Sequence, residues 1–563
     1  MIDKKQHTSF IFLIYSVSAV MFFLLLFPLN RNNIIPVALV GVLVSLLSEK
    51  RKPSKNKTVI AFAVIFTVII SLALYRNYLG IYLPARISII KKISSLTGFA
   101  YETIIRFIGI ISTLLAAAFE YFFSVTLLGM IQILYKHTDK GLLGTAVKND
   151  VGELPKDIGK AIVIVAASIG IGLLLLIGAF SIPIGSIEDH VASTARYLEP
   201  EGMYPKLFTW CTSRLDNSTD AIMFLEAADR SQGTLIEKSM LVSRGATEPN
   251  GSYHTLIDHY VHDIPLRHEI TYSRYWHGYL IFLKPLLAVA DFSMIRGLNL
   301  IVQTIIVLIL VYLLYDRGKK KYILPYIVSL LLIMPYIVSR SMQFSSCYYL
   351  MHIFSVLILL SKDENKEYPF IFLLGGIATA YIDFLTYPMA VFGLPAVFAT
   401  IVNDEETIER KAINVFRFFM FWVIGYALMW SGKWILASML TKENVIADAI
   451  HSILFRASDS TEIGVKNFSG LDVLAENLGK FFYTPFTYVY VICFIYYVLR
   501  ARKTVYEKRV KSFFPYILLM LAPILWLMII KNHSLVHAYF TNKSLIVSAF
   551  AILSMLVSAS EIE

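Results

Sequence analysis

The chain alternates long runs of apolar residues with short polar breaks. About fourteen of these runs approach the 17–25 residues that a helix needs to cross about 30 Å of hydrocarbon. The second, ninth and tenth runs are short, so we expect twelve to fourteen spans in an all-α polytopic membrane protein. The runs cover approximately residues 9–29, 34–48, 58–75, 102–134, 159–183, 297–315, 322–338, 345–361, 369–381, 385–402, 412–440, 483–499, 514–531 and 543–558.

Composition agrees with this pattern. Of 563 residues, 57% are hydrophobic and only 16% are charged, whereas soluble proteins carry about 25% charged residues. These values exclude a single soluble globular domain and a disordered chain. The three cysteines (Cys211, Cys347 and Cys493) are too few and too scattered for a disulfide framework or a CxxC metal site.

The distribution of the net charge of +11 indicates how the chain is oriented in the membrane. Basic clusters such as Lys50-Arg51-Lys52, Lys319-Lys320-Lys321 and the group from Arg500 to Lys511 fall in short gaps between apolar runs. Cytoplasmic loops of membrane proteins have this composition. Strict alternation of the runs then places both termini in the cytoplasm, and we expect no nucleic-acid partner. The first run is too long for a cleavable signal and is interpreted as a retained span.

We expect the chain to have three parts, the first two of which follow from the family resemblance described below. Residues 1–140 form an N-terminal module of four spans. Residues 159–402 form a core that contains the large outer loop 184–296, which is too polar for lipid and is expected to mix helices with irregular structure. Residues 403–563 supply the last spans and the outer loops 441–482 and 532–543.

An acidic pair, Glu188 and Asp189, follows the fifth apolar run. A helical pattern with Val191, Ala195 and Leu198 on one face comes next and stops at Pro200-Glu201-Gly202. A carboxylate at a helix end, half out of lipid, can have a raised pKa and accept a proton from a hydroxyl group. The alternative is that Glu188 or Asp189 only caps the following helix.

The motif that ends in Ala195-x-x-Leu198-x-x-x-Gly202-x-Tyr204-Pro205 resembles the first outer loop of GT-C glycosyltransferases, polytopic enzymes that take a sugar from a polyprenyl-phosphate donor. The end of the loop is also similar, from Tyr275-Trp276-His277-Gly278-Tyr279 to Arg296. The resemblance covers roughly 159–400. It implies that Asp189 or Glu188 is the general base. In that family the loop follows the first span, so the first four spans here are an added module.

Other outer residues are candidates for substrate or phosphate binding. Asp383 interrupts an apolar stretch, and an ionisable group at membrane depth often lines a cavity; the alternative is an exposed hairpin. His533 and His537 are four residues apart on one helical face and could bind phosphate or a divalent metal, or form a satisfied interfacial pair. Arginine suits phosphate. Six arginines are expected at or near the outer surface (Arg196, Arg267, Arg274, Arg296, Arg340 and Arg456), and the phosphate-binding candidates among them are Arg196, Arg274, Arg296 and Arg340.

No metal site or other cofactor is predicted. His254, His259, His262 and Asp263 have spacings loosely compatible with a metal site, but the chain has no HExxH signature. A divalent metal is therefore the less favoured option.

These features predict a glycosyltransferase of the bacterial plasma membrane with an outward-facing site. A carboxylate base would activate an acceptor hydroxyl on a glycan, lipid or protein, which attacks a polyprenyl-phosphate-linked sugar with inversion. One alternative is an O-antigen-type polysaccharide polymerase or ligase, which would depend on outer arginines and a histidine. The other is a lipid-linked sugar transporter or flippase, which predicts charges inside the spans and broken helices in matching halves.

Overall fold

The computed structural model describes residues 154–560 and the single residues Ser95 and Gly98. Short gaps within this range fall at 210, 249–250, 362–363, 404–406, 462–463, 465–466 and 502–505. The predicted N-terminal module 1–140, with its four apolar runs, lies outside the described residues.

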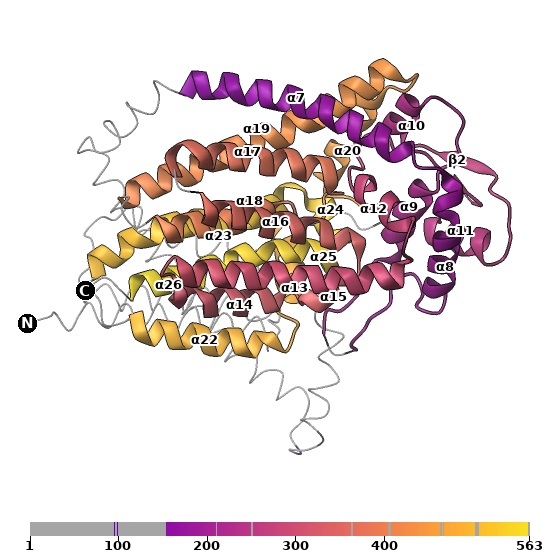
Figure 1. The fold of residues 1–563 in the computed structure, drawn as a ribbon. Coiled ribbons are helices and arrows are strands. Elements are labelled where there is room, and N and C mark those ends of the chain that lie inside the picture. The colour runs from indigo at the N-terminus through magenta and orange to yellow at the C-terminus, as the bar shows by residue number, and fades with distance from the viewer. Residues whose placement is uncertain are drawn as a thin grey trace, which may run out of the picture.

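Each of the ten apolar runs predicted beyond residue 150 coincides with helical structure, and the helices run side by side as a bundle (Figure 1). The run 322–338 is broken, because Met334 has a left-handed backbone (φ 54°) directly before Pro335. The bundle helices are α7 (Leu154–Phe180), α13 (Phe292–Asp316), α14 (Ile323–Leu332), α15 (Pro335–Ser339), α16 (Met342–Leu360), α17 (Glu364–Ile382), α18 (Met389–Val402), α19 (Ile408–Leu440), α22 (Phe486–Ala501), α23 (Tyr506–Ile529) and α26 (Ile546–Ala559).

Within the described residues, five helical segments are long and apolar enough to cross a membrane. A sixth span is possible if α21 (Gly470–Phe481) and α22, which meet at 98°, act as one broken span. The chain is thus a predominantly helical protein with several membrane-spanning helices, and the total of fourteen spans stays a prediction. The five segments are Lys156–Phe180, Phe292–Asp316, Met342–Leu360, Arg410–Leu440 and Ala538–Ala559.

Burial separates the centre of the bundle from its lipid-facing surface. Every residue of α18 from Met389 to Ile401 is buried, and α26 is also largely buried. A helix that is apolar on all sides is expected in such a central position. By contrast, α7 and α13 expose apolar side chains such as Val163, Leu174 and Ile301. Lipid chains would cover this surface.

The segment 184–291 folds into short helices and one small sheet against the end of the bundle (Figure 1). Strand β1 (Arg244–Ala246) pairs antiparallel with β2 (His268–Ile270), so that Arg244 lies opposite Ile270. The helical elements are η2 (Ile184–Ser186), α8 (Glu188–Leu198), α9 (Asn217–Ala227), α10 (Leu235–Leu241), α11 (Ser252–Tyr260) and α12 (Leu280–Leu287).

Segments far apart in the sequence join 184–291 at this end of the bundle. The Thr212 amide donates to the Tyr483 carbonyl (2.9 Å), and the Gly278 amide donates to the Tyr381 carbonyl (2.8 Å). We call segments 184–291, 441–482 and 530–537 together the polar layer. The last two contain α20 (Val445–Arg456), α21 and α24 (Lys531–Val536), after which α25 (Ala538–Thr541), η4 (Asn542–Leu545) and α26 continue the chain.

The basic loops lie at the opposite end of the bundle from the polar layer. The chain enters α13 beside the polar layer, so the turn after α13, with η3 (Lys320–Tyr322), is one helix length away from that layer. The end of α22 at Arg500 and Ala501 lies at this same end. The two basic regions that the structure describes therefore lie at the same end of the bundle, as the sequence predicts, whereas Lys50-Arg51-Lys52 lies outside the described residues.

Two buried lysines bind helix C-termini of the polar layer: Lys284, on α12, joins two helices within the layer, and Lys433 attaches the layer to the bundle. Lys284 Nζ donates to the Ala227 carbonyl at the end of α9 (2.7 Å). Lys433 Nζ, on α19, donates to the carbonyls of Met240 (2.8 Å) and Ser239 (3.2 Å) at the end of α10. A cation at a helix C-terminus binds unpaired carbonyls and interacts favourably with the helix dipole.

Candidate functional site

The acidic pair lies in the first turn of α8, a few residues after the membrane helix α7 ends. The N-cap position is Ile187, and no side chain caps the helix. Neither Glu188 nor Asp189 therefore acts as the cap, which was the alternative to a catalytic role. Their charges still interact favourably with the positive end of the helix dipole.

The structure distinguishes the two acids. Glu188 forms an ion pair with Arg230. Asp189 is exposed, and no hydrogen bond or ion pair to another described residue is present at its carboxylate. Arg196 lies seven residues later on the same exposed face of α8. Asp189 is thus the accessible carboxylate of the pair, and Arg196 is the cation that shares its surface.

Glu201 binds two of the predicted phosphate ligands. Its carboxylate accepts bonds from Arg296 Nη1 at 2.7 and 2.8 Å, and Arg340 Nη2 lies 3.6 Å away. The buried Arg296 also donates to Asn217 Oδ1 (3.1 Å) and to the Arg340 carbonyl (2.7 Å). Tyr197 Oη accepts from both guanidinium groups. Arg296 and Arg340 therefore join α8, α9, α13 and α15.

Asp220, on α9, is a buried carboxylate that sequence reasoning missed. Its Oδ1 accepts from the Ser341 hydroxyl (3.1 Å) and the Gln343 amide (3.1 Å), while Oδ2 has no hydrogen-bond partner. Burial raises the pKa of Asp220 to about 7, although the nearby Arg296 charge opposes this shift. The available signal was an acid directly before the apolar run Ala221–Leu225.

Asp383 holds the turn between α17 and α18. It is buried, so the exposed-hairpin interpretation is wrong. Its carboxylate accepts from the Thr386 amide (2.8 Å), the Thr386 hydroxyl (2.5 Å) and the Ser346 hydroxyl (3.4 Å). The next residue but one, Leu385, has a left-handed backbone (φ 66°). Both carboxylate oxygens of Asp383 are therefore engaged in hydrogen bonds within the protein. These bonds hold the turn in which Leu385 adopts its strained conformation.

His533 and His537 lie together, as their spacing predicts, with ring centroids 4.7 Å apart. His533 Nε2 is 2.8 Å from the Leu385 carbonyl, which can only accept, so Nε2 carries the proton. Burial, followed by the charge of Arg456, lowers the pKa of His537 to about 4, and burial lowers the pKa of His533 as well. Both imidazoles are therefore neutral at pH 7.

Two arginines near these histidines have no carboxylate ion-pair partner among the residues that the structure describes. Arg456 lies 5.5 Å from the centre of the Tyr275 ring. Arg214 lies between the rings of Tyr204 (4.0 Å) and Tyr539 (4.3 Å). We call Arg214, Arg456, His533 and His537 the arginine–histidine group. Guanidinium groups that no described carboxylate neutralises suit an anion.

The remaining predicted arginine has a protein partner. Arg274 Nη1 donates to both oxygens of Asp448, at 3.0 and 3.3 Å, and its guanidinium lies 4.8 Å from the Tyr272 ring centre. Arg274 therefore fixes α20 to the segment after β2. Arg214 was missed because nothing in its local sequence separates it from an ordinary loop arginine.

In the residues that the structure describes, no direct polar contact joins Asp189 to the predicted substrate-binding residues. Across the described part of the chain, no hydrogen bond or ion pair joins Asp189 to Asp383 or to the arginine–histidine group. Among the same residues, no three His, Cys, Asp or Glu side chains are placed to hold a metal ion. Two histidines of the segment 254–263, a candidate metal site in the sequence, have protein partners. His262 Nε2 lies 3.3 Å from Glu199 Oε1, and His259 Nδ1 lies 3.0 Å from the Ile264 carbonyl oxygen.

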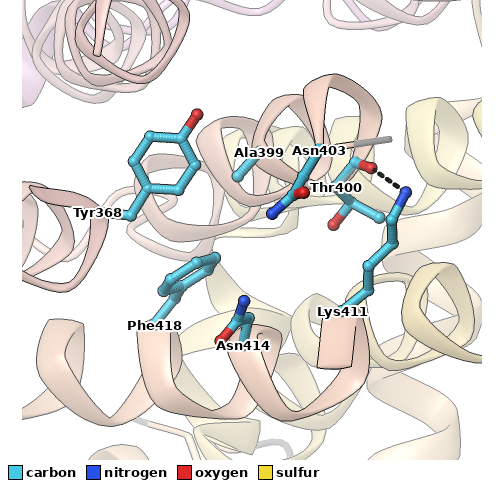
Figure 2. Close-up of a pocket in the computed structure, with 7 residues that line it drawn as sticks. All are labelled: Tyr368, Ala399, Thr400, Asn403, Lys411, Asn414 and Phe418. Carbon is cyan, nitrogen blue, oxygen red and sulfur yellow. Dashed lines mark hydrogen bonds between the residues drawn. The ribbon is translucent and has the colours of Figure 1, made fainter. Parts of the chain in front are cut away.

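A small pocket lies at the other end of the bundle, where α17, α18 and α19 meet (Figure 2). Lys411 Nζ donates to the Thr400 carbonyl across it (3.1 Å). None of the predicted site residues reaches this pocket. Its lining consists of Tyr368, Ala399, Thr400, Asn403, Lys411, Asn414 and Phe418.

Comparisons with known proteins do not assign the chain to a family. No protein-family model, no curated protein and no solved structure matches it.

Proposed function

We propose that the protein is a membrane glycosyltransferase that moves a sugar from a polyprenyl-phosphate donor to an acceptor hydroxyl. One observation supports this function most strongly: Asp189, an exposed carboxylate that is bonded to none of the described residues, lies in the first turn of α8, which follows the membrane helix α7 and the short η2. A lipid-linked donor keeps its tail in the bilayer. Its reactive phosphate then lies at the membrane surface, which is the level at which α7 ends.

In this reaction Asp189 is the general base. It removes the proton from the acceptor hydroxyl while the hydroxyl oxygen attacks the anomeric carbon. The bond from that carbon to the phosphate oxygen breaks, and polyprenyl phosphate leaves with the bonding electrons. Attack opposite the leaving group inverts the anomeric centre. Arg196, on the same face of α8, stabilises the charge that develops on the phosphate, and the ion pair of Glu188 with Arg230 holds the start of the helix.

The test uses the purified full-length chain in lipid nanodiscs with a radiolabelled polyprenyl-phosphate sugar. We expect Asp189→Asn to slow release of polyprenyl phosphate by about 10²–10⁴-fold, the usual effect of removing a general base. Glu188→Gln should have a smaller effect. Glu199→Gln is the matched control, because Glu199 is an exposed carboxylate that directly follows the same helix. Wild-type rates for both Asp189→Asn and Glu188→Gln would rule out the assignment.

The arginine–histidine group favours a second candidate, a polysaccharide polymerase or ligase of the O-antigen type. That reaction would depend on cations and an imidazole rather than on a carboxylate. The second candidate predicts that the protein consumes a lipid-diphosphate glycan but no lipid-phosphate sugar. It also predicts that Arg456→Gln abolishes consumption of the glycan, whereas Asp189→Asn does not. Uptake or lipid scrambling in proteoliposomes without bond cleavage would instead support a transporter.

A further inference from the structure

Helix α20 has three distinct faces. Val445 and Ala449 are buried against the protein, and Arg456 lies on the same packed side. Asp448 and His451 form an exposed polar edge. The third face consists of four large apolar side chains that remain exposed: Ile446 (39%), Ile450 (50%), Ile453 (49%) and Leu454 (67%). We call these four residues the apolar face of α20.

Polar contacts fix this orientation from several sides. The Asn444 side chain caps the helix by accepting from the Ala447 amide (3.1 Å), and the Ser438 hydroxyl accepts from the Val445 amide (3.1 Å). On the polar edge, Asp448 binds Arg274 (3.0 Å). At the last turn, Asn532 Nδ2 donates to the Phe455 carbonyl (3.2 Å). The apolar face therefore points away from the protein because the other two faces are held.

The helix that leads into α20 also exposes apolar side chains. Along α19, exposed apolar side chains recur at Phe416, Met420, Ile435 and Met439 and end at Leu440. At about 1.5 Å per residue, the distance from Arg417 to Leu440 is about 35 Å, close to the thickness of a hydrocarbon core of about 30 Å. The helix thus reaches the membrane surface at Leu440.

The chain then turns through Thr441, Lys442, Glu443 and Asn444 into α20. A polar turn at the end of a membrane-spanning helix is expected where the hydrocarbon gives way to lipid headgroups. A helix with one apolar face and one polar edge at that depth has the composition of an in-plane interfacial helix. Four neighbouring large apolar side chains in water would be costly, and such patches mark membrane or protein contacts.

We propose that α20 is an in-plane membrane helix whose apolar face contacts the acyl chains of the leaflet next to the polar layer. Its occupant is the bilayer itself, because α20 follows the candidate membrane span of α19 after a turn of only four residues. This arrangement places Arg456, on the packed face, at the level of the lipid headgroups. The inference does not depend on glycosyl transfer, and its test does not measure activity.

The test places a single environment-sensitive NBD label on α20 of the full chain in nanodiscs. Ile450→Cys and Leu454→Cys put the label on the apolar face. His451→Cys is the matched control on the polar edge, one residue from Ile450. Background labelling should be low because all three native cysteines (Cys211, Cys347 and Cys493) are buried.

At positions 450 and 454 we expect lipids with doxyl groups on their acyl chains to quench at least half of the fluorescence, and aqueous iodide to quench little. At position 451 we expect the reverse. Iodide quenching of all three labels would place the face in water and overturn the inference. Protection of positions 450 and 454 from both quenchers would show that protein covers the face, and would overturn it equally.

Discussion

The contacts of Glu201 show that arginines of a type that often binds substrate can instead hold the fold together. Arg296 and Arg340 are the residue type that binds phosphate, yet Glu201 accepts bonds from Arg296 and lies 3.6 Å from Arg340. A buried guanidinium without a counter-charge would cost several kcal/mol. The buried Arg296 has such a counter-charge in Glu201, whereas Arg196 is exposed to solvent.

Asp220 gives a prediction at the same scale. Its pKa is about 7 in the folded protein and about 3.9 in an unfolded chain, so between these values the folded state binds more protons. The free energy of unfolding should therefore fall as pH rises from about 4 to about 7, by up to about 1.4 kcal/mol per pH unit, and level off above. Asp220→Asn removes this dependence because an amide does not titrate.

Thermal unfolding of the detergent-solubilised chain at pH 5, 6, 7 and 8 checks this prediction. The Tm of Asp220→Asn, relative to wild type, should rise as pH increases to 7. Asp263→Asn is the control, because Asp263 is exposed and asparagine tolerates its left-handed backbone (φ 55°). Equal pH dependence in wild type and Asp220→Asn would contradict the shifted pKa.

At the scale of elements, the crossing of α17 and α19 depends on two glycines. A Cβ atom at Gly376 would lie 2.1 Å from the Trp422 carbonyl oxygen, and one at Gly425 would lie 2.2 Å from the Leu373 carbonyl oxygen. The backbones of the two helices are therefore in direct contact. Small residues at such crossings are typical of helix packing in membranes.

We predict that Gly376→Ala destabilises the protein by about 1–3 kcal/mol, because the two helices must separate to admit the methyl group. Gly375→Ala is a close control, since its Cβ would meet side-chain atoms at 3.6 Å, an ordinary contact. Alanine alone favours a helix over glycine by about 1 kcal/mol, so this control should be neutral or stabilising. The measurement is the Tm in detergent, and equal Tm values for the two variants would refute the close crossing.

The sequence predicted the long membrane helices better than the short helices of the polar layer. Long apolar runs such as 159–183 and 297–315 coincide with α7 and α13, because a backbone in lipid must bond to itself and a helix achieves this locally. The short helices α9 to α11 carry weaker patterns and depend on contacts from elsewhere, such as the Lys433 bond to the end of α10. The apolar run 322–338 looked continuous, but the left-handed backbone at Met334 interrupts it. The apolar pattern alone does not predict this conformation.

At the scale of the whole molecule, the polar layer and the basic loops occupy opposite ends of the bundle. The proposed function requires the polar layer to face outward, and the positive-inside rule favours that orientation. Single cysteines on the two ends test it. Gln232→Cys lies in the polar layer, Lys320→Cys lies in the basic turn after α13, and both positions are exposed.

On intact cells, a membrane-impermeant maleimide should label Gln232→Cys and leave Lys320→Cys unlabelled until the membrane is opened. The wild-type chain measures the background from its buried cysteines. The opposite labelling pattern would place the polar layer in the cytoplasm and remove the basis for an outward-facing transferase.

The sequence alone determined the apolar helices, their alternation and the sorting of basic residues, because lipid imposes length, hydrogen bonding and charge placement on each segment separately. Only the tertiary structure decided which polar groups are available for chemistry. Glu201 binds Arg296. The Asp383 carboxylate accepts bonds from Thr386 and Ser346, and the Leu385 carbonyl accepts one from His533. By contrast, Asp189 and Arg196 stay exposed. These partners are distant in sequence, and the pairing of a charged group depends on which residues the fold places beside it.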